Sequence, residues 1–431
     1  MLHKNIGINE KGHLTFAGMD TVALAEKYGT PLMLLDEDRI RENIRVYKKA
    51  MRASFGEDSF PLFASKALCF KGIYRIAKEE EIGIDAVSVG ELYTAEAAGF
   101  DLAKAYFHGN NKTDADIAFG VEHGVGTFVV DNVDELLALE KYLAQVGKRQ
   151  RILLRISPGI DPHTFKAVVT GSVDSKFGSP IATGQAEEIT RLALSLEHID
   201  LVGFHCHIGS QIFDHEPFTD AADIMLRFIA LIASETGFVA KELNLGGGLG
   251  VRYIDGHPEI DYAEVIGEMA AVIKARAAEM GMRLPRIVLE PGRSIVADAG
   301  MTLYTVGSVK SIPGYKEYVS IDGGMPDNPR FALYESPYTL YNASRAADKA
   351  DYCAYVVGRC CESGDIIQKD VWLKKPVRGE IVAVAVTGAY NYSMASNYNR
   401  IPRPAIVLIR QGEDRLAVRR ESNEDMIRNE V

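Results

Sequence analysis

Residues 61–66 read Pro61-Leu62-Phe63-Ala64-Ser65-Lys66, a short apolar run over Pro61–Ala64 that is followed by a serine and a lysine. An apolar run of this length is typical of a buried β-strand. Seven similar runs, rich in β-branched and aromatic residues, follow it in the first two thirds of the chain: Gly83–Val87, Ala105–His108, Thr127–Val130, Ile152–Ile156, Leu201–His205, Glu242–Leu245 and Ile287–Leu289. The sequence therefore predicts about eight short buried strands.

Segments with helical periodicity separate most of these runs. Apolar residues recur every three or four positions in Asp134–Leu143 and in Ala263–Ala278, as expected for amphipathic helices. Strands that alternate with helices pair in parallel, and eight such units predict a (β/α)8 barrel, an α/β fold.

The pattern changes beyond about residue 300, where expected strands follow one another without helices. They are Met301–Lys310, Tyr318–Asp322, Asp370–Leu373, Glu380–Thr387 and Ala405–Arg410. Since 431 residues exceed what one modest core holds, we expect two domains. These are a barrel over residues 36–300 and a mostly β domain over residues 1–35 and 301–431. The charged tail from Gln411 is expected to be a solvated surface segment.

The composition restricts the classes of partner. A formal net charge of −11 argues against a nucleic-acid surface or a polybasic membrane patch. The chain has no apolar run long enough to span a bilayer, and its N-terminus lacks a signal-peptide pattern. Five cysteines, without paired C-x-x-C spacing, fit a reducing compartment better than a disulfide framework or a zinc site. We therefore expect a soluble cytoplasmic protein with no metal, nucleic-acid or membrane partner.

One connection between expected strands is unusually long. It includes residues 158–178, which are too polar and too rich in glycine to be helix alone. Because long loops in compact domains usually have a function or are disordered, we interpret this loop as functional.

Polar residues follow the expected strands at the positions where barrel enzymes carry their catalytic groups. They are Lys66, Asp85, Ser88, His108, Arg155, His205, His207, Gly246–Gly248 and Glu290–Arg293. Each alone has an ordinary structural explanation, such as a solvated turn lysine or a flexible glycine turn. Their combination at one end of a barrel indicates a binding site.

The chemistry of these residues suggests pyridoxal 5'-phosphate as the cofactor. The glycine run leaves backbone N–H groups free to bind a phosphate, and Arg293 can add to that anion site. A desolvated Lys66 can form a Schiff base with an aldehyde. Glu290 can keep the ring nitrogen protonated, and His207 can pack on the ring face.

These motifs resemble the fold-type III pyridoxal-phosphate decarboxylases, and within that family the branch that acts on diaminopimelate. The resemblance covers nearly the whole chain. It rests on Gly29–Leu32 and the DEDRIRENI segment that follows, Phe63–Ala67, Asp85–Leu92, Phe107–Lys112, Asp174–Gly178, His205–Gln211, Gly246–Gly248, Glu290–Arg293, Asp327–Tyr334, Cys361–Asp365 and Gly388–Tyr390. It implies an alanine racemase-like fold, with the barrel plus a mostly β C-terminal domain.

The resemblance also implies residue roles. Lys66 and Cys361 would be catalytic, with Cys361 as a proton donor. The cofactor would be bound by Lys66, Asp85, His207, Ser210, Gly247, Gly248, Glu290, Pro291, Gly292, Arg293 and Tyr390. The substrate would be bound by Arg293, Arg330, Tyr334, Glu362 and Tyr390.

The implied reaction is decarboxylation of meso-2,6-diaminopimelate to L-lysine and CO₂, the last step of lysine biosynthesis. Arg293, Arg330 and Tyr334 would hold the distal carboxylate, and Glu362 the distal amino group. In the family the cysteine motif reaches the site of the neighbouring subunit. We therefore expect a homodimer with shared sites, and two-fold dimers are the commonest assembly.

Several alternatives stay open. An ornithine, arginine or carboxynorspermidine decarboxylase would share the cofactor residues but would have no second carboxylate to bind. A racemase of similar fold would be expected to carry an arginine in place of Glu290. A non-catalytic cofactor carrier would lack the β domain and its Cys-Glu-Ser-Gly-Asp motif.

The chain departs from the family pattern at two positions. Phe165 stands where the family often has a second histidine after Pro-His-Thr, which affects the long loop. Cys360 duplicates the expected catalytic cysteine, and we assign the role to Cys361 because it directly precedes Glu-Ser-Gly-Asp.

Overall fold

A computed structural model describes residues 1–160 and 174–431. They form two compact units. The barrel unit comprises Ile44–Gly250 and Ile260–Gly292, and the β unit comprises Met1–Asn43, Val251–Glu259 and Arg293–Val431. We predicted a barrel domain over residues 36–300 and a β domain over residues 1–35 and 301–431. The functions of these two domains stay predictions.

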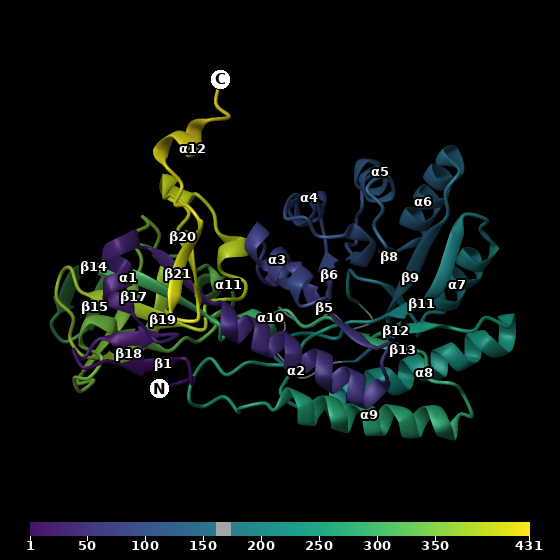
Figure 1. The fold of residues 1–431 in the computed structure, drawn as a ribbon, viewed down its shortest axis with the longest axis horizontal. Coiled ribbons are helices and arrows are strands. Elements are labelled where there is room, and N and C mark those ends of the chain that lie inside the picture. Colours follow the sequence, from purple (N-terminus) through teal and green to yellow (C-terminus); the bar gives the residue numbers. More distant parts are fainter. Residues whose placement is uncertain (161–173) are drawn as a thin grey trace. The chain divides into compact units, whose positions relative to one another are not determined.

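The barrel unit contains a closed parallel barrel of eight strands, as predicted (Figure 1). The strands are β5 (Phe60–Ala64), β6 (Gly83–Ala86), β7 (Ala105–Phe107), β8 (Thr127–Val130), β9 (Gln150–Ser157), β11 (Ile199–His205), β12 (Glu242–Asn244) and β13 (Arg286–Leu289). Parallel pairing of β13 with β5 and of β8 with β9 closes the barrel. A two-residue strand, β10 (Ser179–Pro180), pairs with the end of β9.

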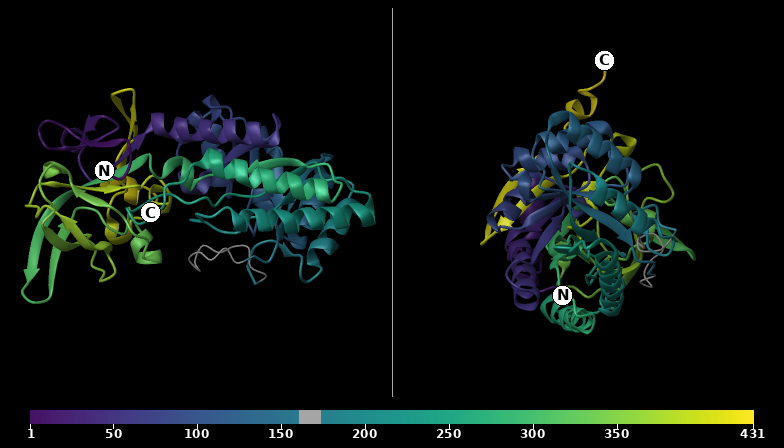
Figure 2. Two further views of the ribbon diagram at one scale, coloured as in Figure 1. Left: turned by 90° about the horizontal axis from the view of Figure 1, so that it is seen from below. Right: turned by 90° about the vertical axis from the view of Figure 1, so that its right-hand side faces the viewer.

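Helices lie outside the strands of the barrel (Figure 2). They are α3 (Lys71–Glu79), α4 (Val89–Ala97), α5 (Asp114–Glu122), α6 (Val133–Val146), α7 (Gln185–Ser195), α8 (Glu216–Thr236) and α9 (Tyr262–Glu279). Both amphipathic segments that we identified are helical, within α6 and α9. The longer helix α2 (Glu37–Phe55) begins in the β unit and ends in the barrel unit.

Side-chain caps fix where several of these helices begin. Ser88 and Asn132 accept backbone N–H groups at the start of α4 and α6. Thr113 forms a capping box with Asp116 at the start of α5. Such caps satisfy N–H groups that have no partner within the helix. Ser88 and Asn132 lie two residues after the ends of β6 and β8, so their caps help define the short loops at these strand ends.

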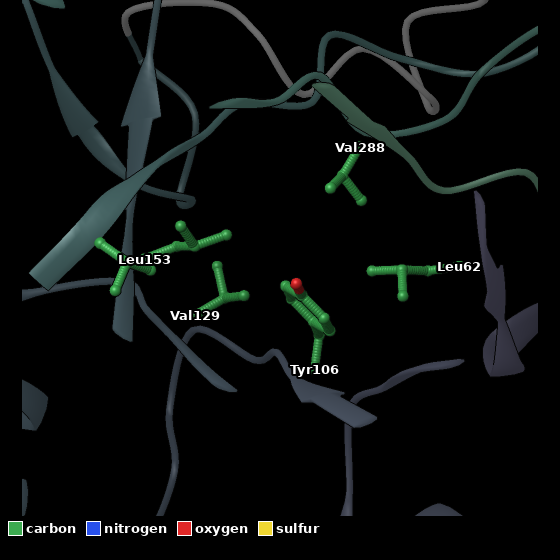
Figure 3. Close-up of a cluster of buried hydrophobic side chains, with 6 residues drawn as sticks. Leu62, Tyr106, Val129, Leu153 and Val288 are labelled. Carbon is green, nitrogen blue, oxygen red and sulfur yellow. The ribbon is translucent and has the colours of Figure 1, made fainter. Parts of the chain in front are cut away.

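Buried side chains that each come from a different strand form a cluster inside the barrel (Figure 3). The cluster consists of Leu62, Tyr106, Val129, Leu153, Val202 and Val288, each at most 5% exposed. A packed interior of this kind is typical of (β/α)8 barrels, which are not pores. It makes the strands a rigid support for the residues at their ends.

The β unit contains a three-stranded sheet and a nine-stranded sheet. The first has β1 (Ile6–Ile8), β2 (Leu14–Phe16) and β3 (Met19–Asp20), followed by helix α1 (Thr21–Tyr28). The second has β4 (Leu32–Asp36), β14 (Gly300–Ile312), β15 (Lys316–Ile321), β16 (Leu340–Asn342), β17 (Tyr352–Val357), β18 (Ile366–Leu373), β19 (Ile381–Ala385), β20 (Ala405–Arg410) and β21 (Glu413–Val418). The unit also contains the short α-helices α10 (Arg293–Val296), α11 (Arg330–Tyr334) and α12 (Asn423–Ile427).

The tail from Gln411 has no buried residue, as expected for a surface segment, and it also has regular structure that the sequence did not indicate. The segment carries strand β21, which pairs antiparallel with β20, and helix α12. Its residues are half-buried or exposed. Strand β21 is therefore an edge strand without a buried apolar pattern, and it is stabilised by backbone pairing with β20. Phe165 and most of the long loop lie outside the described residues. Within the described part of the chain, no helix is long and apolar enough to cross a membrane.

Candidate active site

Lys66 lies two residues beyond the end of β5, in a short 3-10 helix over Ser65–Ala67. Its neighbours Ser65 and Ala67 are buried, whereas Lys66 itself is exposed. The N–H of Ala64 donates to the carbonyl oxygen of Pro291 at 3.2 Å, which links the lysine turn to the loop after β13. The structure therefore places Lys66 beside the Glu290–Gly292 segment, as expected for neighbouring barrel strands.

Glu290 is the centre of a buried polar cluster and is 6% exposed. His108 Nε2 lies 2.8 Å from its Oε1, and His205 Nε2 lies 3.1 Å from its Oε2. Asn244, the last residue of β12, donates from Nδ2 to Oε1 at 2.7 Å. Three strand ends thus direct nitrogen atoms at one carboxylate.

The electrostatics of the cluster favour a charged Glu290. Burial by itself would raise the pKa of Glu290, but the charges and hydrogen bonds of His108 and His205 hold it well below its usual range. Burial lowers the pKa of His205 to about 4. By contrast, burial raises the pKa of Asp85, whose carboxylate lies 3.8 Å from His108 Nε2.

The glycine run after β12 is tightly enclosed by backbone. A Cβ atom at Gly247 would lie 2.1 Å from the carbonyl oxygen of Glu290, and one at Gly248 would lie 2.4 Å from that of Gly209. Gly246 and Gly248 also have positive φ angles of 70° and 133°. Only glycine suits these positions, and a glycine run just after a strand is the kind of segment whose backbone N–H groups can bind a phosphate.

The loop after β11 contains His207 and Ser210 and packs against the glycine run. The N–H of Ile212 donates to the carbonyl oxygen of Gly248 at 3.0 Å, and the N–H of Gly250 donates to the carbonyl oxygen of Ile212 at 2.8 Å. Burial, together with the nearby positive charges of Lys66 and Arg155, lowers the pKa of His207 well below its usual value. His207 is therefore a neutral ring at physiological pH.

Residues 174–178, the described end of the long loop, are attached to two strand ends. The guanidinium carbon of Arg155 lies 4.4 Å from the centroid of the Phe177 ring. The carbonyl oxygen of Phe177 accepts a hydrogen bond from Ser157 Oγ at 2.6 Å. The N–H of Gly178 donates to Asp131 Oδ1 at 3.0 Å. This end of the loop therefore belongs to the polar face of the barrel.

The β unit contains a second polar cluster, formed by two buried arginines and two buried tyrosines. Arg293 Nη1 donates to Tyr253 Oη at 2.9 Å, and the Arg330 guanidinium lies 5.0 Å from the centroid of the same ring. Arg330 also donates to Tyr338 Oη and to Ser336 Oγ, each at 3.1 Å. Among residues 1–160 and 174–431, no carboxylate forms an ion pair with Arg330.

Tyr390 and Asn391 adjoin this cluster. The ring of Tyr390 lies 4.7 Å from the Arg293 guanidinium, and Tyr338 Oη donates to Asn391 Oδ1 at 3.1 Å. Tyr390 has a φ of 61° and Val386, shortly before it, has a φ of 62°. Residues other than glycine rarely adopt such φ angles, and those that do are concentrated at functional sites.

The cysteine motif forms the loop between β17 and β18. Cys361 and Glu362 are exposed, whereas Cys360 is half-buried. Burial and the adjacent Asp365 carboxylate raise the pKa of the Cys360 thiol to about 12. The raised pKa disfavours Cys360 as the reactive thiol, and Cys361 is the more exposed of the two.

The predicted residues thus fall into three groups. The barrel unit gathers Lys66, Asp85, His207, Ser210, Gly247, Gly248, Glu290, Pro291 and Gly292. The β unit gathers Arg293, Arg330 and Tyr390 around Tyr253. Tyr334, the last residue of α11, and the Cys361–Glu362 pair lie elsewhere in the β unit, without a described contact to that cluster.

Sequence reasoning missed four residues that support these groups: Asn244, Tyr253, Tyr338 and Asn391. Asn244 ends a strand and could have been found from that position. The other three carry no local signal, because their importance arises from contacts with residues distant in the sequence.

The barrel cluster has two possible ligands on chemical grounds. His108, His205 and Glu290 offer ligand atoms within 4.8 Å of one another, which would suit a metal ion. The glycine cradle, the lysine turn and the charged Glu290 together fit pyridoxal phosphate, which needs a phosphate site, an amine and a partner for its ring nitrogen.

Comparisons with known proteins agree with the second fit. Residues 37–297 match the family of pyridoxal-dependent decarboxylases, over the pyridoxal binding domain. Diaminopimelate decarboxylase of Bacillus subtilis is 44% identical over 99% of this chain and 97% of its own length, and that of Bacillus methanolicus is 43% identical over 97% of each. The crystal structure of diaminopimelate decarboxylase from M. jannaschii in complex with L-lysine has a TM-score of 0.91 at 32% identity, covering 100% of this chain and 99% of that one.

Proposed function

Because this chain belongs to the diaminopimelate decarboxylases, within the pyridoxal-dependent decarboxylases, we propose that it converts meso-2,6-diaminopimelate to L-lysine and CO₂. Its cofactor is pyridoxal 5'-phosphate. The observation that carries the substrate assignment is the buried Arg330, which is 6% exposed and pairs with no carboxylate among the described residues. A buried cation without an anion is costly, so the distal carboxylate of diaminopimelate is a suitable partner.

The barrel residues are suited to hold the cofactor. Lys66 would bind its aldehyde, the Gly246–Gly248 backbone its phosphate, and the Glu290 carboxylate its ring nitrogen. When bound, pyridoxal phosphate supplies a protonated ring that accepts the electrons released with CO₂. The low pKa of Glu290 supports this role, since a permanent carboxylate stabilises a cationic ring nitrogen. The neutral ring of His207 is suited to pack on an aromatic face.

The β unit would supply the substrate contacts. Arg293 and Arg330, with Tyr334, would bind the distal carboxylate, and Glu362 would bind the distal amino group. Tyr390 would contact both cofactor and substrate, and Ser210, Asp85, Pro291 and Gly292 would complete the cofactor site. After CO₂ leaves, the Sγ–H of Cys361, or the Lys66 ammonium, would donate a proton to the α-carbon. A well-placed general acid typically contributes about 10²–10⁴-fold.

The direct test is product formation with added pyridoxal phosphate. Separate reactions contain meso-diaminopimelate, L-ornithine, L-lysine or L-arginine, and are followed by CO₂ release and mass spectrometry. Lysine is expected only from diaminopimelate. Turnover of a basic amino acid alone would contradict the substrate assignment while keeping the cofactor, and no turnover with bound cofactor would favour a carrier.

We also propose a homodimer with shared sites. Cys361 and Glu362 are exposed on their loop, so in each chain they are available to a neighbouring subunit. When inactive Lys66→Ala and Cys361→Ala chains are mixed, each hybrid dimer should have one intact site and so about half of the wild-type activity. After random exchange of equal amounts, in which about half of the dimers are hybrids, the mixture should recover about a quarter of the wild-type activity. No recovery despite demonstrated subunit exchange would contradict shared sites.

A cytoplasmic location completes the proposal. All five cysteines are free, which suits a reducing compartment. Cell fractionation with a compartment marker would test this, and recovery in an extracellular fraction would contradict it.

A further inference from the structure

The loop that carries Cys360 and Cys361 is closed around a buried carboxylate. Asp365, at the end of the loop, is 3% exposed. Its Oδ2 accepts the N–H of Cys360 at 2.7 Å, and its Oδ1 accepts the N–H of Met325 at 2.6 Å. One side chain therefore joins the cysteine loop to the turn at residues 323–328.

Two glycines make room for this carboxylate. A Cβ atom at Gly358 would lie 2.2 Å from Asp365 Oδ2, and one at Gly324 would lie 2.5 Å from Oδ1. No larger residue fits either position without moving the carboxylate. The backbone is thus shaped to enclose an aspartate at this point.

The neighbouring amide is held by a different side chain. The N–H of Cys361 donates to Asn399 Oδ1 at 2.8 Å. The N–H of Arg359 donates to the carbonyl oxygen of Gly323 at 3.0 Å. Three consecutive amides, at residues 359, 360 and 361, therefore have fixed partners, although the side chains of Cys361 and Glu362 are exposed.

The turn that Asp365 binds leads directly into the arginine segment. The carbonyl oxygen of Gly324 accepts the N–H groups of Asp327 and Asn328 at 3.1 and 2.8 Å. Gly324 in turn donates to Asp327 Oδ1 at 3.0 Å. Helix α11, which begins at Arg330, follows two residues later. The position of the cysteine loop is thus tied to the start of the arginine helix.

We propose that Asp365 and Asn399 are positioning residues for the Cys361 thiol, holding the amides of Cys360 and Cys361 so that Cys361, and not Cys360, is presented for reaction. The proposal rests on the proposed role of Cys361 as proton donor. Asp365 has two effects: it fixes the loop that carries Cys361, and, together with burial, its charge raises the pKa of the Cys360 thiol. A purely structural aspartate would affect stability without changing which thiol reacts.

The experiment compares thiol reactivity in the full-length holoprotein without substrate. Wild-type, Asp365→Asn and Asn399→Gly proteins are labelled with a disulfide reagent at pH about 8, and labelling of Cys360 and Cys361 is resolved by peptide mass spectrometry. Asn399→Gly removes the acceptor but suits the φ of 51° at that position. Asp370→Asn, the same change at an exposed residue of β18, is the matched control.

Wild type and Asp370→Asn should label mainly at Cys361. Asp365→Asn should raise the rate at Cys360 about tenfold or more, because loss of one unit of pKa raises the thiolate fraction tenfold. It should also lower kcat/KM for diaminopimelate by about tenfold. Asn399→Gly should lower the rate at Cys361 about threefold and lower kcat/KM by a similar factor, as expected for one lost hydrogen bond.

An unchanged ratio of Cys360 to Cys361 labelling in a folded Asp365→Asn protein would overturn the proposal. If that variant does not fold, Asn399→Gly decides, and wild-type labelling and kinetics there would equally overturn it. The thiol rates need no substrate. An absence of diaminopimelate turnover by the wild type would therefore refute the proposed function without affecting this test.

Discussion

Arg293 donates a hydrogen bond from Nη1 to the phenol oxygen of Tyr253 at 2.9 Å, and the two residues are both buried. The ring of Tyr253 also lies against Arg330, so one tyrosine contacts both arginines. Burial would raise the pKa of Tyr253, but the two guanidinium groups lower it below its usual value. Tyr253 therefore stabilises two adjacent positive charges in the place where we propose that a carboxylate binds.

Tyr253→Phe should weaken substrate binding more than it slows the chemical step. The change keeps the ring but removes the hydrogen bond to Arg293, and hydrogen bonds to charged groups are worth about 1.5–3 kcal/mol. We expect KM for diaminopimelate to rise about tenfold and kcat to change less than about threefold. Steady-state kinetics measure both. Tyr315→Phe, the same change at an 85% exposed residue, should leave both constants unchanged; a fall in kcat alone in Tyr253→Phe would exclude a binding role.

Lys66→Ala should abolish the covalent cofactor adduct. Without the Lys66 amine the aldehyde of pyridoxal phosphate has no partner at this strand end, so the protein-bound absorbance band should be lost and should not return with excess cofactor. Absorbance spectra after gel filtration measure this. Lys71→Ala, an exposed lysine at the start of α3, is the control and should keep the band. Survival of the band in Lys66→Ala would show that another lysine binds the cofactor.

Gly247→Ala should disrupt the proposed phosphate cradle. The new methyl group would lie 2.1 Å from the carbonyl oxygen of Glu290, so the backbone of one segment must shift. Overpacking of this kind costs typically about 1–3 kcal/mol, and we expect cofactor affinity to fall about tenfold or more. Titration of the apoprotein with pyridoxal phosphate measures it.

Gly267→Ala is the matched control for the cradle. Gly267 lies in helix α9, and a Cβ atom there would meet nothing within 4 Å. It should bind cofactor like wild type and be more stable by roughly 0.5–1 kcal/mol, the helix propensity difference. Equal cofactor affinity in the two variants would argue that the phosphate binds elsewhere.

The barrel and its strand ends were predictable because their signals are local. Each strand is a short apolar run, and the residue that follows it lies at one end of the barrel by the geometry of parallel pairing. The structure therefore has Lys66, Glu290 and the glycine run just after the ends of β5, β13 and β12, where the sequence predicted them. The resemblance to a family added roles for them, and these roles stay predictions.

The support around these residues was not predictable in the same way. Tyr253 and Tyr338 matter because they contact Arg293 and Arg330, which are distant in the sequence. Strand β21 was missed because its polar side chains show no apolar pattern, and its pairing with β20 is a backbone interaction. The choice of Cys361 over Cys360 came from a motif, whereas its physical support, the proximity of Asp365 to Cys360, needed coordinates.

His205 should make the protein less stable as the pH falls from about 6.5 to about 4. Burial lowers its pKa from 6.5 to about 4, so in this range the unfolded chain binds a proton that the folded chain does not. By linkage, this contribution to stability is complete above pH 6.5 and is lost as the pH falls toward 4. At pH about 5 the loss is roughly 2 kcal/mol for this residue.

His205→Gln separates this effect from the titration of carboxylates such as Glu290, whose low pKa also favours acid unfolding. The variant cannot take up the proton, so the difference in melting temperature between pH about 7 and pH about 5 should be smaller than in wild type, even if the variant is less stable at both. Thermal unfolding of the holoprotein at the two pH values measures it. His123→Gln, at a half-exposed histidine paired with Glu96 at 2.9 Å, should keep the wild-type difference. An unchanged pH dependence in His205→Gln would mean that His205 is already protonated in the folded protein, where it forms an ion pair with the Glu290 carboxylate.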